Sequence, residues 1–352
     1  MAISRRVFLV RSGQAAGLVA ASGALGGFLE AAAGPAGASP AKKSLTAVTY
    51  QLGWLANVEN AGEFVADTRG YFKDEGIKIT LLPGGPTTTV EPEVISGKCL
   101  VGLSETDTTA RAIDQGGHLK TIAATLQSTP LGVCSLASKP YLTPKSLYGK
   151  KLGIQSFQVE VFKAFYKMIG LDWSKINVIP ATGDPSILSS GEVDALSVLV
   201  TNEPITLALK GIKTHVWTLG QHGWSVFGDT LEVATKSLNN TKERDLLVHV
   251  VRAVARGWQN ALADPTPATA MVVDHYGKNL DLNSKQQLLS LKAFKSMIET
   301  PYTKAHGLLK MSEADIEVNL KSIRSEGIKV SKSALFDTTV LADAYNGATR
   351  IN

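Results

Sequence analysis

Trp54 and Glu203 are the side chains in this sequence whose chemistry and position best suit the binding of a small molecule. Each comes directly after a predicted buried strand, where side chains of α/β folds reach into a binding site. An indole face stacks on flat rings. An ionised carboxylate accepts hydrogen bonds only, so it selects donors or cations and repels a sulfonate. Together they predict a site for a flat molecule that carries hydrogen-bond donors.

Each of these residues also has an ordinary structural interpretation. Trp54 could belong to the hydrophobic core, and Glu203 could be an acidic residue at the start of a helix, where the helix dipole favours it. Asn57 either orients a ligand or caps a helix, and the sequence favours neither. Asn202 directly precedes Glu203 and joins it as a predicted site residue.

The remaining predicted site residues lie in loops beside predicted strands: Gly85, Pro86, Ser104, Gln155, Phe157 and Trp224. The glycine pair before Pro86 permits a close approach of backbone to ligand. Phe157 offers a second stacking surface, and its bulk argues against a loop that cradles anions. Trp224 either covers the ligand or is an exposed aromatic side chain on a lobe surface.

The elements that position these residues follow from hydrophobic periodicity. The first block alternates strands and helices, and its predicted elements are Thr46–Leu52, Ala61–Gly70 continuing to Glu75, Ile77–Leu82, Val90–Ser96, Leu100–Leu103, Thr106–Asp114, Thr121–Leu126 and Leu131–Ala137. A second block repeats the alternation from Leu152 to Leu219. Such alternation predicts mostly parallel sheets with helices on both faces.

The last third of the sequence is predicted to be helical. Its helices are Lys242–Ala263, Thr266–His275, Ser284–Ile298 and Ser312–Glu326, and they follow a strand at Thr230–Ala234. Pro265 and Pro301 break this region. Two α/β blocks and a helical return predict two lobes that the chain crosses twice, with a cleft at their junction.

The amino terminus carries an export signal. Ser4-Arg5-Arg6-Val7-Phe8-Leu9 matches the twin-arginine signature, a short apolar run follows, and Ala36-Gly37-Ala38 fits a peptidase site. Residues 1–38 are therefore predicted to be a twin-arginine signal peptide, recognised by the twin-arginine translocase, and the mature protein is predicted to be periplasmic. The run is too short and too rich in Gly and Ala for a membrane anchor.

Composition excludes several function classes. The formal net charge is +5, and the signal peptide holds three arginines and one glutamate, so the mature chain carries only +3. No nucleic-acid partner is expected. The only cysteines, Cys99 and Cys134, stand in apolar surroundings and are predicted to be buried thiols, although a periplasmic disulfide is also possible. No metal site and no cofactor are expected.

The sequence resembles the periplasmic solute-binding proteins of ATP-driven importers, of the thiamine-pyrimidine-precursor, alkanesulfonate and nitrate type. The resemblance rests on Leu52–Glu59, Gly70–Ile77, Leu82–Pro86, Gly149–Gly153, Gly191–Ala195 and Phe227–Asp229, in that order, within residues 48–294. In the pyrimidine binders an aromatic residue at the position of Trp54 stacks on the ligand. An acidic residue matching Glu203 accepts hydrogen bonds from its ring nitrogen and amino groups.

The resemblance implies an α/β fold of two lobes, the type II periplasmic binding protein, with two mixed, mostly parallel sheets and a hinge of two crossings. Lobe one would comprise residues 45–137 and 231–352, and lobe two residues 138–230, with crossings near Ser138–Pro140 and Gly228–Asp229. Closure about such a hinge is the usual mechanism of these proteins.

The function that the resemblance implies is that of a monomeric receptor. It would capture a planar nitrogen heterocycle, a thiamine pyrimidine precursor or a riboflavin-like compound, and deliver it to the permease and ATPase subunits of an importer. Alternatives are a nitrate, alkanesulfonate or taurine binder, or an enzyme like the related pyrimidine synthase. Two isolated cysteines do not supply the cysteine-rich iron motif that such an enzyme needs.

Overall fold

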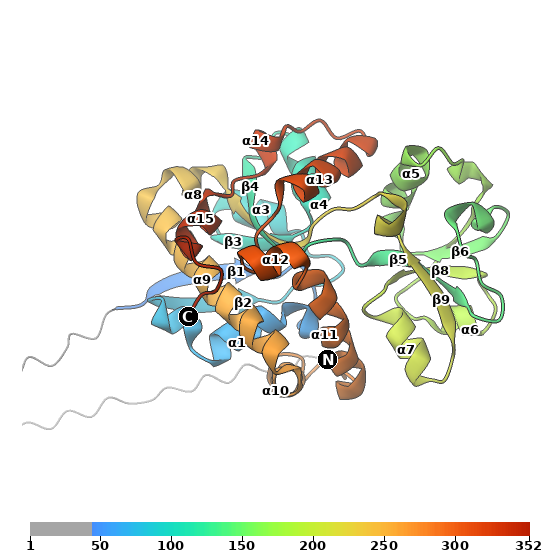
Figure 1. Ribbon diagram of the computed structural model, residues 1–352, viewed down its shortest axis with the longest axis horizontal. Helices are drawn as coiled ribbons and strands as arrows, with labels where there is room; N and C mark the ends of the chain where they lie inside the picture. Colours follow the sequence, from blue (N-terminus) through green and yellow to red (C-terminus); the bar gives the residue numbers. More distant parts are fainter. Residues whose placement is uncertain (1–43) are drawn as a thin grey trace, which may run out of the picture. The chain divides into compact units, whose positions relative to one another are not determined.

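The computed structural model describes residues 44–352, which form part of one compact unit. The predicted signal peptide lies outside the described residues. Two five-stranded sheets organise the chain, with the strand orders β2-β1-β3-β10-β4 and β7-β6-β8-β5-β9. We call each sheet with its surrounding helices the first and the second lobe (Figure 1).

The ten strands are short and largely buried. They are β1 (Thr46–Gln51), β2 (Ile77–Leu82), β3 (Val101–Ser104), β4 (Leu119–Leu126), β5 (Leu131–Leu136), β6 (Lys151–Ile154), β7 (Asn177–Pro180), β8 (Ala195–Leu199), β9 (Thr214–Thr218) and β10 (Gly228–Ala234). In each sheet four strands run in one direction and one strand, β10 or β5, runs against both of its neighbours. The predicted mixed, mostly parallel sheets are therefore confirmed.

Each reversed strand is the first strand after the chain crosses from the other sheet. β5 follows β4 of the first sheet but pairs with β8 and β9 of the second, and β10 follows β9 but pairs with β3 and β4. The expectation that Leu131–Ala137 closes the first lobe is therefore wrong. The crossings lie at residues 127–130 and 219–227, and Ser138–Pro140 falls within the second lobe.

Helices flank both sheets. Those before the first crossing are η1 (Val58–Asn60), α1 (Ala61–Thr68), α2 (Tyr71–Asp74), α3 (Val90–Ser96) and α4 (Thr106–Asp114). The second lobe contributes η2 (Pro144–Leu147), η3 (Ser156–Gln158), α5 (Val159–Met168), η4 (Trp173–Lys175), α6 (Ser186–Ser189), α7 (Glu203–Leu209) and η5 (Gly220–His222).

The helical return covers the first sheet. It comprises α8 (Thr235–Asn239), α9 (Thr241–Ala263), α10 (Pro265–Met271), a π-helical turn η6 (Val272–Tyr276), α11 (Ser284–Ile298), α12 (Pro301–His306), α13 (Glu313–Ser325), α14 (Lys332–Leu335) and α15 (Thr339–Tyr345). Pro265 and Pro301 each occupy the first helical position, where the missing N–H has no intrahelical partner to lose. No described helix is long and apolar enough to span a membrane.

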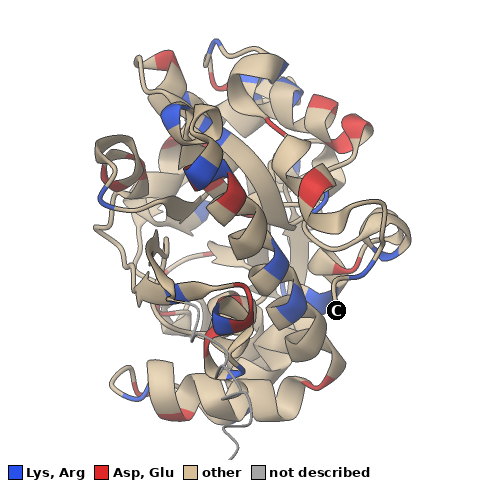
Figure 2. Cartoon of the chain, turned by 90° about the vertical axis from the view of Figure 1, so that its left-hand side faces the viewer, with Lys and Arg blue, Asp and Glu red and all other residues tan. Residues whose placement is uncertain are grey.

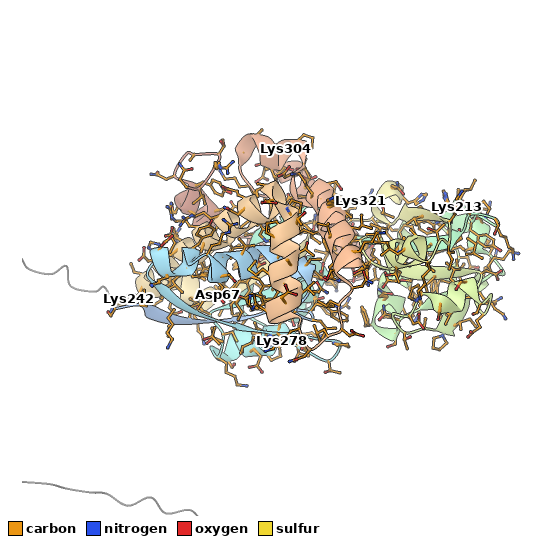
Figure 3. The ribbon with its side chains drawn as sticks, turned by 90° about the horizontal axis from the view of Figure 1, so that it is seen from below. Asp67, Lys213, Lys242, Lys278, Lys304 and Lys321 are labelled. Carbon is orange, nitrogen blue, oxygen red and sulfur yellow. The ribbon has the colours of Figure 1, made fainter. Side chains whose placement is uncertain are left out.

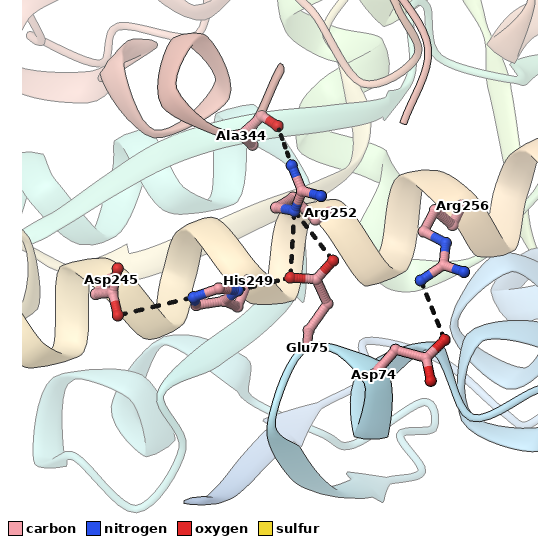
Figure 4. Close-up of polar contacts among 7 residues, drawn as sticks. All are labelled: Asp74, Glu75, Asp245, His249, Arg252, Arg256 and Ala344. Carbon is pink, nitrogen blue, oxygen red and sulfur yellow. Dashed lines mark hydrogen bonds and ion pairs between the residues drawn. The ribbon is translucent and has the colours of Figure 1, made fainter. Parts of the chain in front are cut away.

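Partly buried polar contacts fasten the long helix α9 to its neighbours (Figure 4). Glu75, after α2, accepts from His249 Nδ1 at 2.6 Å and from Arg252 Nε at 3.0 Å. Arg252 also donates to the carbonyl of Ala344 on α15. Because the mostly buried carboxylate of Glu75 bonds to both side chains, and Arg252 also reaches α15, this network fixes α2, α9 and the carboxyl-terminal helix together.

Charged groups of both signs are otherwise dispersed over the surface. Figure 2 shows Lys and Arg interspersed with Asp and Glu on the face it presents. In Figure 3 the labelled Lys242, Lys278 and Lys304 lie at the periphery of the first lobe. This distribution agrees with the small net charge and forms no continuous basic surface in these views.

The tightest helix contact in the first lobe depends on glycine. A Cβ atom on Gly257 of α9 would lie 2.0 Å from the carbonyl oxygen of Gly62 on α1, and one on Gly62 would overlap the ring of Trp258. Neither a backbone carbonyl nor a buried indole can move aside cheaply. The close approach of α1 and α9 therefore requires both glycines.

We predict that Gly257→Ala lowers the free energy of unfolding by about 2–4 kcal/mol, because overpacking here forces the two helices apart. Gly183→Ala is the matched control, since a Cβ atom there meets nothing within 4 Å. Its unfolding free energy should stay within about 0.5 kcal/mol of the wild type. Urea unfolding at constant m-value measures both, and equal effects of the two substitutions would contradict the packing argument.

Candidate functional site

The loops at one edge of the first sheet hold Trp54 in place through their backbone. Leu52 N donates to Leu82 O, and Gly84 N donates to the carbonyl of Trp54, both at 2.9 Å. A Cβ atom on Gly84 would lie 2.4 Å from Leu52 O, so this close approach requires glycine at position 84. Gly85 has more room, with its nearest contact at 3.6 Å to Leu55. The indole of Trp54 is left half-buried.

Asn57 serves as a helix cap in this structure. Its side-chain oxygen accepts from Glu59 N at 2.7 Å at the start of η1. This is one of the two roles that the sequence left open, and it leaves the Asn57 amide nitrogen available to a ligand. The cap also fixes the backbone that carries Glu59, a residue that the sequence analysis did not select.

Three carboxylates gather at this edge because β10 runs antiparallel. Thr230 pairs with Ser104, which sets Asp229 beside Glu105, the residue that follows β3. A Cβ atom on Gly228 would lie 3.1 Å from Glu105 Oε2. Glu59 joins them from the β1–α1 loop, and its carboxyl group and that of Asp229 each influence the pKa of the other. We call Glu59, Glu105 and Asp229 the acidic cluster.

Asp229 is buried, and Glu59 and Glu105 are half-buried beside it. The pKa of Glu59 is raised to about 7, mainly by burial; a hydrogen bond with Asp229 lowers this pKa, and the charge of Glu203 raises it. Burial also raises the pKa of Glu105 and of Asp229 well above their usual ranges, and the mutual repulsion of the carboxylates adds to both. Asp229 Oδ2 has no hydrogen-bond partner within the described chain. In their ionised form, three such groups favour a ligand that brings donors or positive charge.

Ser104 stands at the end of β3 with its hydroxyl already engaged. Ser104 Oγ donates to Glu91 Oε1 at 2.6 Å, and Thr230 Oγ1 donates to the Ser104 carbonyl. Pro86 is exposed in the turn after Gly85. These residues border the same loops as Trp54 and the acidic cluster.

The second lobe presents Glu203 at the corresponding edge of its sheet. Glu203 is 4% exposed and begins α7; Leu199 N donates to its Oε2 at 2.8 Å, and Asn202 Nδ2 donates to its Oε1 at 3.2 Å. Burial raises its pKa to about 7. The Glu203 carboxylate thus lies in the first turn of α7 and also near the end of β8, so both of its expected positions apply. The charge of Glu203 also contributes to the raised pKa of Glu59, which is an interaction between the two lobes.

The other predicted residues differ in accessibility. Phe157 is 61% exposed in η3 and free to stack on a ligand, and Gln155 is half-buried beside it. Trp224 is 1% exposed and belongs to the hydrophobic core, so its interpretation as an exposed aromatic is wrong. Two surface pockets, of about 590 and 260 Å³, lie elsewhere, at residues 324–331 and among α1, α9, α10 and η6.

The two cysteines are buried free thiols, as predicted. Cys99 and Cys134 belong to separate hydrophobic clusters, and burial raises the pKa of the Cys134 thiol to about 11. Within residues 44–352, no group of three or more His, Cys, Asp or Glu side chains is arranged to hold a metal ion.

The family model described as NMT1/THI5 like matches residues 57–268. The chain belongs to the NMT1/THI5-like family. The riboflavin-binding protein RibY of Chloroflexus aurantiacus is 24% identical to this chain over 246 residues, which are 68% of this chain and 69% of RibY. The 4-amino-5-hydroxymethyl-2-methylpyrimidine phosphate synthase of Aspergillus parasiticus is 27% identical over 134 residues. The chain spans 39% of that synthase.

Solved structures show the same fold at low identity. The periplasmic nitrate-binding protein NrtA from Synechocystis superposes with a TM-score of 0.62 at 10% identity, over 86% of this chain and 89% of NrtA. The periplasmic aliphatic sulphonate binding protein SsuA from Escherichia coli gives 0.61 at 13%, over 79% and 85%. The expected periplasmic binding protein fold is therefore confirmed for this member of the NMT1/THI5-like family.

We predict that Asp229→Asn is more stable than the wild type near pH 8, by on the order of 1–3 kcal/mol. Because the folded-state pKa of Asp229 is raised, the folded protein holds this proton more tightly than the unfolded chain, and stability falls as pH rises toward the folded-state pKa. Asparagine cannot ionise, and it tolerates the φ of 47° at this position.

The advantage of Asp229→Asn should shrink near pH 4, where the wild type is largely protonated. Urea unfolding at both pH values measures it. Asp184→Asn is the control of opposite sign, because hydrogen bonds from Ser186 lower the pKa of the exposed Asp184, and that variant should gain nothing near pH 8. An advantage of Asp229→Asn that does not grow with pH would contradict a raised pKa at this carboxyl.

Proposed function

We propose that this protein is the extracytoplasmic solute-binding component of an ATP-binding-cassette importer, and that its ligand is a small planar nitrogen heterocycle. Trp54 stacks on the ring, and the acidic cluster with Glu203 accepts its N–H groups. The protein delivers the ligand to a permease driven by an ATPase. Export through the twin-arginine translocase, which the sequence predicts, brings the folded receptor to the periplasm.

One observation carries this choice of ligand. Glu59 of the first lobe and Glu203 of the second are carboxyl groups in the same region, and the charge of Glu203 contributes to the raised pKa of Glu59. A nitrate or sulfonate placed beside them would add a negative charge where the ionisation of carboxyl groups is already disfavoured. An aminopyrimidine or another donor-rich heterocycle instead relieves the repulsion and supplies the missing hydrogen bonds. This chain shares the fold of SsuA and NrtA, but its carboxyl groups favour a ligand class other than sulfonate or nitrate.

The same reasoning favours a receptor over an enzyme. The synthase relatives match only part of their own length, whereas RibY, named a binding protein, matches over more than two thirds of both chains. The two cysteines lie in separate hydrophobic clusters, so they do not combine into one ligand set. The protein should bind one heterocycle per chain. The heterocycle should be chemically unchanged after incubation with the protein. Product detected by mass spectrometry would overturn the receptor assignment.

We predict that titration calorimetry with four probes separates the ligand classes. 4-Amino-5-hydroxymethyl-2-methylpyrimidine or riboflavin should bind, while nitrate and an alkanesulfonate should not, because the carboxylates oppose an anion. Glu59→Gln should weaken heterocycle binding about tenfold, the usual effect of losing one charge-assisted hydrogen bond. Binding of the anions with no heterocycle binding would refute the proposal.

Trp54→Ala is expected to weaken heterocycle binding by about ten- to a hundredfold, because stacking of one base on an aromatic ring contributes about 1–3 kcal/mol. Leu142→Ala is the matched control, since Leu142 is an apolar side chain of the second lobe that is 58% exposed. Both variants should keep the wild-type circular dichroism spectrum. An unchanged affinity in Trp54→Ala would remove this indole from the site.

A further inference from the structure

Two adjacent glutamines of α11 connect the recognition loops of the two lobes. Gln287 Oε1 accepts from Val58 N at 3.1 Å, and Gln287 Nε2 donates to Gln286 Oε1 at 2.7 Å. Gln286 Nε2 donates to Asn202 Oδ1 at 2.8 Å, and Asn202 Nδ2 donates to Glu203 Oε1 at 3.2 Å. We call this series of four hydrogen bonds the amide relay.

The direction of the amide relay is set at both of its ends. A backbone N–H can only donate, so Val58 requires the oxygen of Gln287 to face it. At the other end the Glu203 carboxylate accepts, so Asn202 must present its nitrogen there. Each amide between them donates through nitrogen and accepts through oxygen. All four bonds point from the first lobe to the second, and bonds aligned in this way polarise one another.

Burial makes the amide relay costly to break. Gln286 and Gln287 are 7% and 6% exposed, so an amide that lost its partner would have little access to water. The first turn of α11 is itself fixed, because Asn283 Oδ1 accepts from Gln286 N at 2.9 Å. One turn later, Ser290 Oγ donates to the Thr201 carbonyl at 2.6 Å, next to Asn202.

The body of α11 belongs to the first lobe. Its apolar residues Leu291, Phe294 and Ile298 are buried in the main hydrophobic cluster, and Gln127 N donates to the carbonyl of Met297. The amino-terminal turns of the same helix therefore reach the β8–α7 turn of the second lobe from a rigid base. These turns thus link Asn202 and Glu203 by hydrogen bonds to the β1–α1 loop.

We propose that Gln286 and Gln287 are positioning residues that couple the two halves of the binding site. They hold the Glu203 side of the site in register with the loop that carries Asn57 and Glu59. This inference rests on the proposed function, because it assigns the amide relay to ligand retention. Ligand held by both lobes is released when the relay breaks, so loss of a relay member speeds dissociation more than it slows association.

The first test needs no ligand. Val58 is the first residue of η1, and its amide hydrogen is held by Gln287 alone among the contacts described. Asn202→Ala, a change in the other lobe, should speed amide hydrogen exchange at Val58 by about five- to tenfold, a typical effect of weakening one hydrogen bond. Gln221→Ala is the control, because Gln221 is an exposed glutamine that bonds only within its own lobe.

The coupling would be overturned if the rate of amide hydrogen exchange at Val58 were the same as in the wild type in both Asn202→Ala and Gln286→Leu. Equal acceleration across the whole first lobe would overturn it too, since that pattern reports general loss of stability. Urea unfolding of each variant identifies such a general loss of stability. Ser290→Ala serves as a second variant that removes an interlobe hydrogen bond outside the amide relay. Its effect on Val58 should be smaller than that of Asn202→Ala.

The second test uses 4-amino-5-hydroxymethyl-2-methylpyrimidine in stopped-flow measurements. Gln286→Leu should raise the dissociation rate constant about five- to tenfold and leave the association rate constant within about twofold. Equal changes in the two rate constants would overturn the role in retention. Failure of the wild type to bind any heterocycle would refute the proposed function, whereas the exchange experiment would still decide whether the lobes are coupled.

Discussion

The pairing of β10 between β3 and β4 is the interaction on which the candidate site depends. Its backbone bonds to both neighbours complete the first sheet, and its reversed direction sets Asp229 beside Glu105. A parallel strand in this position would present its other end, and the carboxylates would not meet. β5 has the same place in the second sheet, between β8 and β9. The two lobes thus repeat one arrangement, with each reversed strand supplied after a crossing.

The acidic cluster makes the free energy of folding less favourable, and contacts elsewhere in the first lobe offset this effect. Burying several carboxyl groups raises their pKa values and opposes folding near neutral pH. Close helix packing at Gly62 and Gly257 and the ion pairs around Glu75 act in the opposite direction, away from the site. Strain and repulsion held at a binding edge are typical of functional sites. The amide relay adds directional bonds where the lobes meet.

Much of the secondary structure could be predicted because it is encoded locally. Ile77–Leu82, Val90–Ser96 and Ser284–Ile298 were expected with the bounds that the structure shows, since periodicity, caps and glycine stops act within a few residues. Leu131–Ala137 was expected as a strand, and the structure shows one at Leu131–Leu136, but it was placed in the wrong lobe. Its partners lie some sixty to eighty residues further along the chain, and no local pattern identifies them.

The candidate site was predictable to a similar degree. Strand ends pointed to Trp54 and Glu203, whereas the acidic cluster was missed because Asp229 joins it only through the antiparallel register of β10. Trp224 was expected either to cover the ligand or to be an exposed aromatic on a lobe surface, but tertiary packing leaves it only 1% exposed. The π-helical turn after α10 was also missed, and residues 266–275 were expected as one helix. Long-range pairing accounts for the main failures.

Gly228 and Leu126 are cross-strand partners at the two ends of the crossings. The chain therefore leaves the first sheet and returns to it at a single point, and β4 with β10 forms a hairpin whose loop is the entire second lobe. A turn of two to five residues is all that such a pair of strands requires. The second lobe is in this sense a domain inserted into a turn, and the first lobe can be joined across the gap without altering the order of its strands.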